Sequence, residues 1–160
     1  MEKEFLEIIT KHQAIILKVC RMYGSSRDDS EDLFQEIVFQ LWRSFPGFRQ
    51  DAKVTTWMYR LALNTAITSL RKNGQKQQWQ PLSTGHGNIP EPETERLDVV
   101  YDQELQTAVN VLNKLDKALV MLYLDEKSYR EMAEIMELSE ANIGVKINRI
   151  KKKLKQILNP

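Results

Sequence analysis

The sequence contains few of the residues on which metal, disulfide or covalent chemistry depends. Its 160 residues include one cysteine and two histidines. Cys20 alone cannot form an internal disulfide, and with His12 and His86 it gives no zinc-ligand spacing. The chain also has no P-loop, no Rossmann glycine fingerprint and no nucleophile elbow. We therefore expect a protein that is not an enzyme and that holds no metal or other cofactor.

Long apolar runs are missing as well. No eighteen consecutive residues are apolar, and the first twelve alternate charged and hydrophobic residues instead of forming a secretory signal. The hydrophobic fraction of 42% is nevertheless enough to build a core. We expect a cytoplasmic chain with no membrane span, organised as one domain or two small ones.

The net charge of +1 conceals an uneven distribution of charge along the chain. Residues 46–80 and residues 139–160 each carry six Lys or Arg against one acidic residue. Residues 81–138, between them, carry five basic against twelve acidic residues. This alternation predicts two separate contacts with a polyanion, joined by a segment that avoids it or meets a different partner.

The clearest local pattern lies in residues 127–158. Ser128 and Glu131 have the spacing of a capping box, and Ser139 can cap a longer helix that begins near Glu140. One face of that helix is apolar, and another carries Asn142, Lys146, Arg149 and Lys153. Two helices joined by a tight turn predict a helix-turn-helix whose second helix enters a DNA major groove. A surface hairpin with a solvated lysine face is the alternative interpretation.

Helical periodicity also dominates the first half of the chain. We expect one helix from Phe5 to Tyr23 and a second after Gly24, with Ser26 near its cap and a buried side formed by Leu33, Phe34, Ile37, Val38, Leu41 and Trp42. A third helix from about Thr55 aligns Arg60, Asn64, Thr68 and Arg71 on one face. Such side chains can bind phosphates and base edges, and nearby aromatic residues can stack on unpaired bases. For Phe45 and Trp57 we favour burial in the core.

Residues 74–95 are rich in glycine, proline and glutamine and show no periodicity, which predicts a linker. Trp79 within it could anchor the linker or contact a partner. Helical patterns resume at about Leu97, and a short apolar helix is expected from Lys117 to Leu124. We therefore predict an all-α fold of two small helical domains, residues 1–73 and 97–160, joined by a flexible linker over residues 74–96.

Three segments together carry a resemblance to a known family. They are DLFQEIVFQLW at 32–42, FRQDAKV at 48–54 and TTWMYRLALNTAITSLRK at 55–72, followed by the polar linker and the helix-turn-helix. In this order they resemble the extracytoplasmic-function (ECF) sigma factors of the sigma-70 family, over nearly the whole chain. The resemblance implies a cytoplasmic bacterial protein that binds core RNA polymerase at the clamp coiled coil and the flap, binds promoter DNA, and answers to an anti-sigma factor.

The resemblance also implies roles for individual residues. The polymerase contact would involve Asp32, Gln35 and Glu36. The first domain would read and help to open the minus-ten element with Phe48, Arg49, Lys53, Tyr59, Arg60, Asn64 and Arg71. The second would read the minus-thirty-five element with Ser139, Asn142, Lys146, Arg149 and Lys153.

The chain departs from the family pattern at four positions. Thr68 stands where an aspartate is frequent, and Glu137 stands where a glycine is frequent in the turn. Gly144 and Val145 replace a frequent lysine and serine, which leaves less polar reach early in the recognition helix. We therefore expect a DNA preference of its own. The alternative function is a stand-alone helix-turn-helix repressor or activator with a helical N-terminal domain for ligand binding or dimerisation.

Overall fold

The computed structural model describes residues 1–48, 53–76 and 103–159, and all regular structure within these ranges is helical. The chain divides into two compact units, Met1–Asn88 and Ile89–Pro160. The all-α, two-domain fold predicted from the sequence is therefore confirmed, while Trp79 and most of the predicted linker lie outside the described residues. Every helix in the described ranges is too short or too polar to cross a bilayer.

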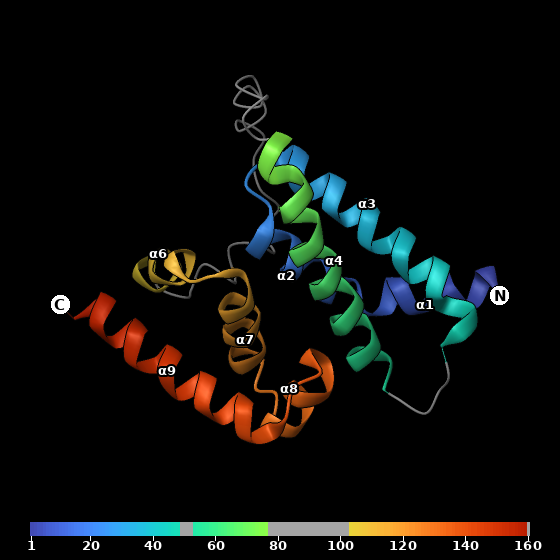
Figure 1. Ribbon diagram of the computed structural model, residues 1–160. Coiled ribbons are helices and arrows are strands. Elements are labelled where there is room, and N and C mark those ends of the chain that lie inside the picture. Colours follow the sequence, from blue (N-terminus) through green and yellow to red (C-terminus); the bar gives the residue numbers. More distant parts are fainter. Residues whose placement is uncertain (49–52, 77–102, 160) are drawn as a thin grey trace. The chain divides into compact units, whose positions relative to one another are not determined.

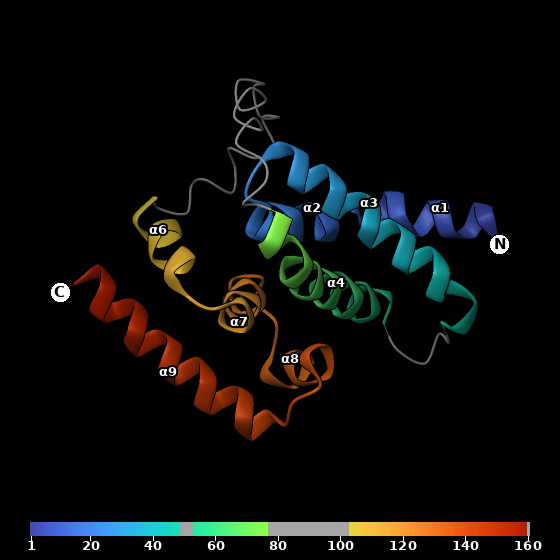
Figure 2. The ribbon, with the colours of Figure 1, turned by 45° about the horizontal axis from the view of Figure 1, so that its top comes forward.

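The first unit is built from α1 (Glu2–Lys11), α2 (Gln13–Tyr23), α3 (Arg27–Ser44), the 3-10 turn η1 (Phe45–Gly47) and α4 (Val54–Lys76). Helices α2, α3 and α4 pack against one another, as Figures 1 and 2 show. Their shared core consists of side chains with almost no exposure, among them Ile16, Val19, Ile37, Leu41, Met58 and Ala62.

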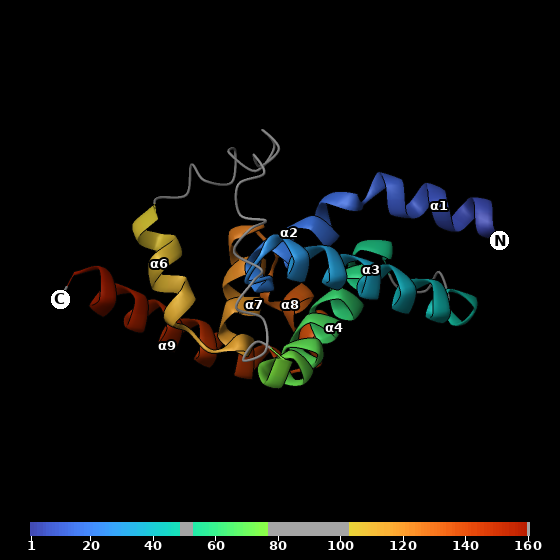
Figure 3. The ribbon, with the colours of Figure 1, turned by 90° about the horizontal axis from the view of Figure 1, so that it is seen from above.

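The prediction of a single helix from Phe5 to Tyr23 is wrong, because the structure has two helices here. The chain breaks at His12, whose φ of −112° and ψ of 24° separate α1 from α2. The break lets α1 take its own direction beside the end of α3 (Figure 3). Phe5 then packs edge-on against Trp42 and Phe45, with ring centroids 5.0 and 5.4 Å apart. Local periodicity is the same on both sides of His12, so these tertiary contacts decide where the helix ends.

Helix α3 begins where its cap was predicted. The Asp29 amide donates to the Ser26 hydroxyl at 3.1 Å, and Asp28 and Asp29 occupy the first turn, where the helix dipole favours negative charge. The preceding corner needs Gly24, because a Cβ there would lie 2.7 Å from the carbonyl oxygen of Cys20. A bond to α2 adds to these local contacts, because the Ser30 hydroxyl donates to the Cys20 carbonyl at 3.3 Å.

The second unit contains α6 (Gln103–Val111), α7 (Lys114–Leu124), α8 (Tyr129–Met136) and α9 (Glu140–Leu158). Helix α9 packs on α6, α7 and α8 (Figure 1). The predicted apolar helix starts three residues early, at Lys114, because the Asn113 side chain caps it by accepting from the Asp116 amide at 2.8 Å. The core side chains with at most 2% exposure include Leu119, Leu122, Met132, Ile143 and Ile147.

Candidate docking and nucleic-acid surfaces

The predicted docking residues lie on the solvent side of α3. Asp32, Gln35 and Glu36 are all exposed, and Glu36 accepts a hydrogen bond from Gln40 at 3.1 Å. The opposite row of the same helix, Leu33, Ile37 and Leu41, is buried. Since the buried row fixes the rotation of α3, the polar side chains are held outward on a rigid support.

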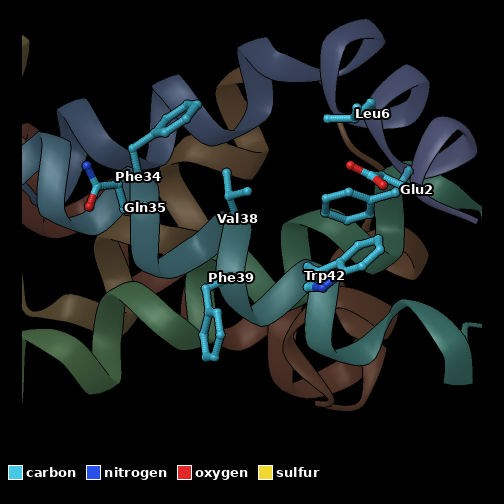
Figure 4. Close-up of a pocket in the computed structure, with 8 residues that line it drawn as sticks. Glu2, Leu6, Phe34, Gln35, Val38, Phe39 and Trp42 are labelled. Carbon is cyan, nitrogen blue, oxygen red and sulfur yellow. The ribbon is translucent and has the colours of Figure 1, made fainter.

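A second row of α3 borders an apolar groove. Phe34, Val38 and Trp42 were predicted to be buried, but Phe34 and Val38 are only half-buried and 41% of Trp42 is exposed. The short α1 covers this row only in part, through Phe5 and Leu6. The groove has a volume of about 600 Å³ and is lined by Glu2, Phe5, Leu6, Phe34, Gln35, Val38, Phe39 and Trp42 (Figure 4).

This groove and the docking residues share one side chain, Gln35. Phe39, one turn further along α3, is 54% exposed at the groove. A polar row and a partly exposed apolar row therefore run side by side on one helix. Large aromatic residues beside a polar rim are the usual composition of a protein-binding surface.

An aromatic cluster joins the end of α3 to the start of α4. The Phe48 ring stacks on Trp57 at 4.5 Å between centroids, and Phe45 lies 6.4 Å from Phe48 and 6.1 Å from Trp57. All three residues are half-buried. Phe45 and Trp57 therefore pack against other rings as expected, but neither is fully buried in the core as predicted. The contacts also bring Phe48, a predicted DNA contact, into the same cluster.

The polar face of α4 lies where the sequence placed it. Arg60, Asn64 and Thr68 are exposed, as is Lys53 just before the helix. Arg49 and the side chain of Arg71 lie outside the described residues. Tyr59 differs from its expected role: only 4% of it is exposed, so in this conformation its ring packs in the core and does not present a stacking surface to a base.

The helix-turn-helix forms with the predicted caps. The Glu131 amide donates to the Ser128 hydroxyl and the Ser128 amide donates to the Glu131 carboxylate, each at 3.1 Å, which completes the capping box. The Asn142 amide donates to the Ser139 hydroxyl at 3.1 Å and starts α9. These local bonds fix the beginnings of both helices.

The turn between the two helices contains a non-glycine residue in a left-handed conformation. Glu137 has a φ of 57° and a ψ of 43°, and the amides of Glu137 and Leu138 both donate to the carbonyl of Ala133. This region is costly for residues that carry a Cβ, which is why glycine is favoured there. The departure noted at this position therefore stores strain in the turn.

The predicted cationic face of α9 is largely exposed. Asn142, Arg149 and Lys153 are exposed, Lys146 is partly buried, and Ser139 is exposed while its hydroxyl caps the helix. The row directly opposite the buried isoleucines is a different one, because each residue turns the helix by about 100°. That outermost row consists of Ala141, Val145, Asn148 and Lys152, all exposed, and of these only Val145 was noted from the sequence.

One lysine of α9 interacts with α7 instead. The Lys151 ammonium lies 4.7 Å from the centroid of the Tyr123 ring. A hydrogen bond with Tyr123 raises the pKa of Lys151, although partial desolvation opposes the shift. The basic residues of α9 thus differ in role, because Lys151 interacts with Tyr123 of α7 within the same unit.

The described residues contain no group of three or more His, Cys, Asp or Glu side chains arranged to hold a metal ion. The surfaces above offer instead exposed carboxylates, amides, basic groups and aromatic rings. Such groups can form ion pairs, hydrogen bonds and stacking contacts with protein and nucleic-acid partners.

Comparison with known families accounts for both units. The family model for Sigma-70 region 2 matches residues 8–76, which include α3 and α4. The model for Sigma-70, region 4 matches residues 102–154, which include α8 and most of α9. The chain belongs to the sigma-70 family. Its region 4 match and its relatives show that this sigma factor is of the ECF type, in agreement with the resemblance seen in the sequence.

Two curated relatives of this sigma factor match it from end to end. The ECF RNA polymerase sigma-E factor of Haemophilus influenzae is 26% identical, with 99% of this chain and 89% of the relative covered. The ECF RNA polymerase sigma factor SigW of Bacillus subtilis is 26% identical, with coverages of 96% and 88%.

Two solved structures share the fold of this sigma factor. The sigma factor RpoE of Bartonella quintana, crystallised with the anti-sigma factor NepR, has a TM-score of 0.68 at 19% identity, covering 98% of this chain and 95% of that one. CnrH, in complex with the cytosolic domain of CnrY, has a TM-score of 0.67 at 18% identity, with coverages of 99% and 90%.

Proposed function

We propose that this sigma-70 family chain docks on core RNA polymerase through Asp32, Gln35 and Glu36 and directs the polymerase to promoters. The observation that carries the proposal is the outward polar row of α3, held by a fully buried opposite row. The chain itself performs no covalent chemistry in this role. Its place of action is the bacterial cytoplasm, where polymerase and promoter DNA are found.

The α1–α3 groove would enlarge this docking surface. Asp32 and Glu36 supply negative charge, which steers a basic partner and fixes its orientation, while Phe39 and Trp42 offer apolar area for affinity. A partner helix that lay along α3 would meet both rows at once. This fits the clamp coiled coil, which the family resemblance implies as the contact; the flap is the second expected polymerase site.

The minus-ten element would be read by the first unit. Lys53, Arg60 and Asn64 are exposed and supply a cation or an amide to phosphates and base edges. Phe48 is half-buried between contacts with Trp57 and Phe45, so an unpaired base would stack on the exposed part of this aromatic cluster. Arg49 and Arg71 stay in the proposal as sequence predictions. Tyr59 does not, because its ring is buried.

The minus-thirty-five element would be read as duplex by α9. Asn142, Arg149 and Lys153 are exposed on one side of this helix, with Lys146 at the edge of the core and Ser139 at the N-terminus. A helix of this diameter fits the major groove, and its N-terminal residues contact base edges in helix-turn-helix proteins.

Control by an anti-sigma factor is part of the proposal. The sigma factor RpoE, similar in fold to this chain, was crystallised with its anti-sigma factor NepR. An inhibitor that covered the polar row and groove of α3 would compete directly with the polymerase. Both partners would then depend on the same exposed side chains.

The docking proposal is tested with the double substitution Asp32→Lys and Glu36→Lys in the full chain. Reversing two charges at a complementary interface places like charges together, so we expect the affinity for core polymerase to fall roughly ten- to hundredfold. Affinity is measured by titrating labelled protein with core enzyme. Circular dichroism melting should be unchanged, because both side chains are exposed.

The matched control is Glu4→Lys with Glu7→Lys. It makes the same change in net charge in the same unit, at two exposed residues of α1 that do not line the groove. We expect this variant to bind core polymerase like the unmodified chain. Equal affinity for the α3 variant and the control would contradict the assignment of the docking row.

A further inference from the structure

The first two turns of α9 present an apolar strip to solvent. Ala141 and Val145 are exposed, and 54% of Val145 is accessible. They lie four residues apart and therefore one above the other on the outermost row, opposite Ile143 and Ile147. Further along this row the side chains become polar, with Asn148 and then Lys152. The outward face thus changes from apolar to polar towards its C-terminal end.

The stability of the unit gives no reason for a valine at position 145. A β-branched residue at an exposed helical position is less favourable than lysine or glutamine, and here it gains little burial in return. Isolated exposed hydrophobic residues are common on proteins. This one, however, occupies the part of the recognition helix that contacts base edges in helix-turn-helix complexes.

The neighbouring Gly144 does not belong to this strip. A Cβ at Gly144 would lie 3.6 Å from the Tyr129 ring, so this position faces α8. Asn142 and Arg149 flank Val145 at three residues before and four residues after it, on the same side of the helix. The valine is therefore enclosed along the helix by groups that form hydrogen bonds and ion pairs.

We propose that Val145, with Ala141 beside it, recognises the 5-methyl group of a thymine in the upstream promoter element. That methyl is the one apolar feature that the four unmodified base pairs present in the major groove, and alanine-like side chains are among its usual partners. Valine adds area and, being nearly fixed in one rotamer on a helix, loses little entropy on binding. This inference rests on the proposed promoter function and names the base that this position selects.

The test uses holoenzyme reconstituted from core polymerase and the full chain. Holoenzyme first enriches its preferred duplexes from a randomised DNA pool, and each thymidine of the enriched upstream element is then replaced singly by deoxyuridine, which lacks only the methyl group. We expect one replacement to weaken binding about fourfold, the effect of losing one buried methyl. In the variant Val145→Ser the same replacement should have almost no effect, because the partner of the methyl is gone.

The matched control is Val111→Ser. Val111 lies at the end of α6 in the same unit and is 61% exposed, but it is not on the recognition helix. This variant should keep the fourfold deoxyuridine effect. An upstream element without a methyl-sensitive thymine, or an effect that persists in Val145→Ser, would overturn the assignment while leaving the promoter function intact. A holoenzyme that enriched no sequence would instead overturn the proposed function, and this inference with it.

Discussion

The backbone conformation of Glu137 lowers the stability of the helix-turn-helix. Its φ of 57° is in the left-handed region, where a side chain is strained and glycine is not. We predict that Glu137→Gly raises the free energy of unfolding of the chain by about 1 kcal/mol. Urea denaturation followed by circular dichroism measures this change.

Glu134→Gly is the control for this substitution. Glu134 is an exposed residue inside α8, three positions before Glu137, and pairs there with Arg130 across one helical turn. Glycine in a helix interior lowers stability by about 1 kcal/mol. The same change of residue should therefore act in opposite directions at the two positions. Destabilisation at both would show that the turn is not strained.

Residue-scale predictions from the sequence succeeded where the cause was local. The caps at Ser26, Ser128 and Ser139 depend on bonds to amides three residues away, and all three are present. The burial of Tyr59 depends on how α4 packs against other helices, which its own neighbours in the sequence do not specify.

At the scale of elements, the reactivity of the Cys20 thiol reports how closely α2 packs against its neighbours. This residue is 3% exposed, and burial raises the pKa of the Cys20 thiol to about 12, with Arg21 opposing the shift. At pH 8 we predict that a thiol reagent labels the native chain at least tenfold more slowly than the urea-unfolded chain. Native labelling as fast as unfolded labelling would contradict the close packing of α2 on α3 and α4.

The same shift has a consequence for stability in alkali. The folded chain holds the Cys20 proton up to about pH 12, whereas the unfolded chain releases it near pH 9.0. Above pH 9 the unfolded state therefore binds fewer protons than the folded state. The contribution of Cys20 to the free energy of unfolding consequently falls as the pH rises towards 12. Below pH 9 the contribution is fully present and does not change.

The helices themselves were largely predictable because their apolar periods are long. The errors arose where two elements meet. The break at His12 follows from the contacts of Phe5 with α3 and η1, and the half-exposed row of Phe34, Val38 and Trp42 follows from the shortness of α1. On α9 the charged side is evident from the residue types, whereas the outermost row is defined only by the phase of the buried isoleucines.

At the scale of the whole chain, the order of the segments carried the prediction of function. Each motif by itself can be explained without any function. An acidic helix face is usually just solvated, and a basic helical hairpin can be an ordinary part of a protein surface. Their succession in one chain is matched by the two sigma-70 family models and by relatives that align from end to end. The predicted domain limits at residues 73 and 97 stay predictions, because the second falls outside the described residues.

The most direct test of the central claim is transcription by reconstituted holoenzyme. Core polymerase free of other sigma factors is combined with this chain, and the 5′ ends of transcripts made from genomic DNA fragments of the source bacterium are mapped. We predict discrete start sites that share an upstream and a minus-ten element and that disappear with core enzyme alone or with the Asp32→Lys, Glu36→Lys variant. Transcripts no more defined than those of core enzyme alone, together with tight binding of the free protein to a palindromic duplex, would contradict the account and indicate a repressor or activator.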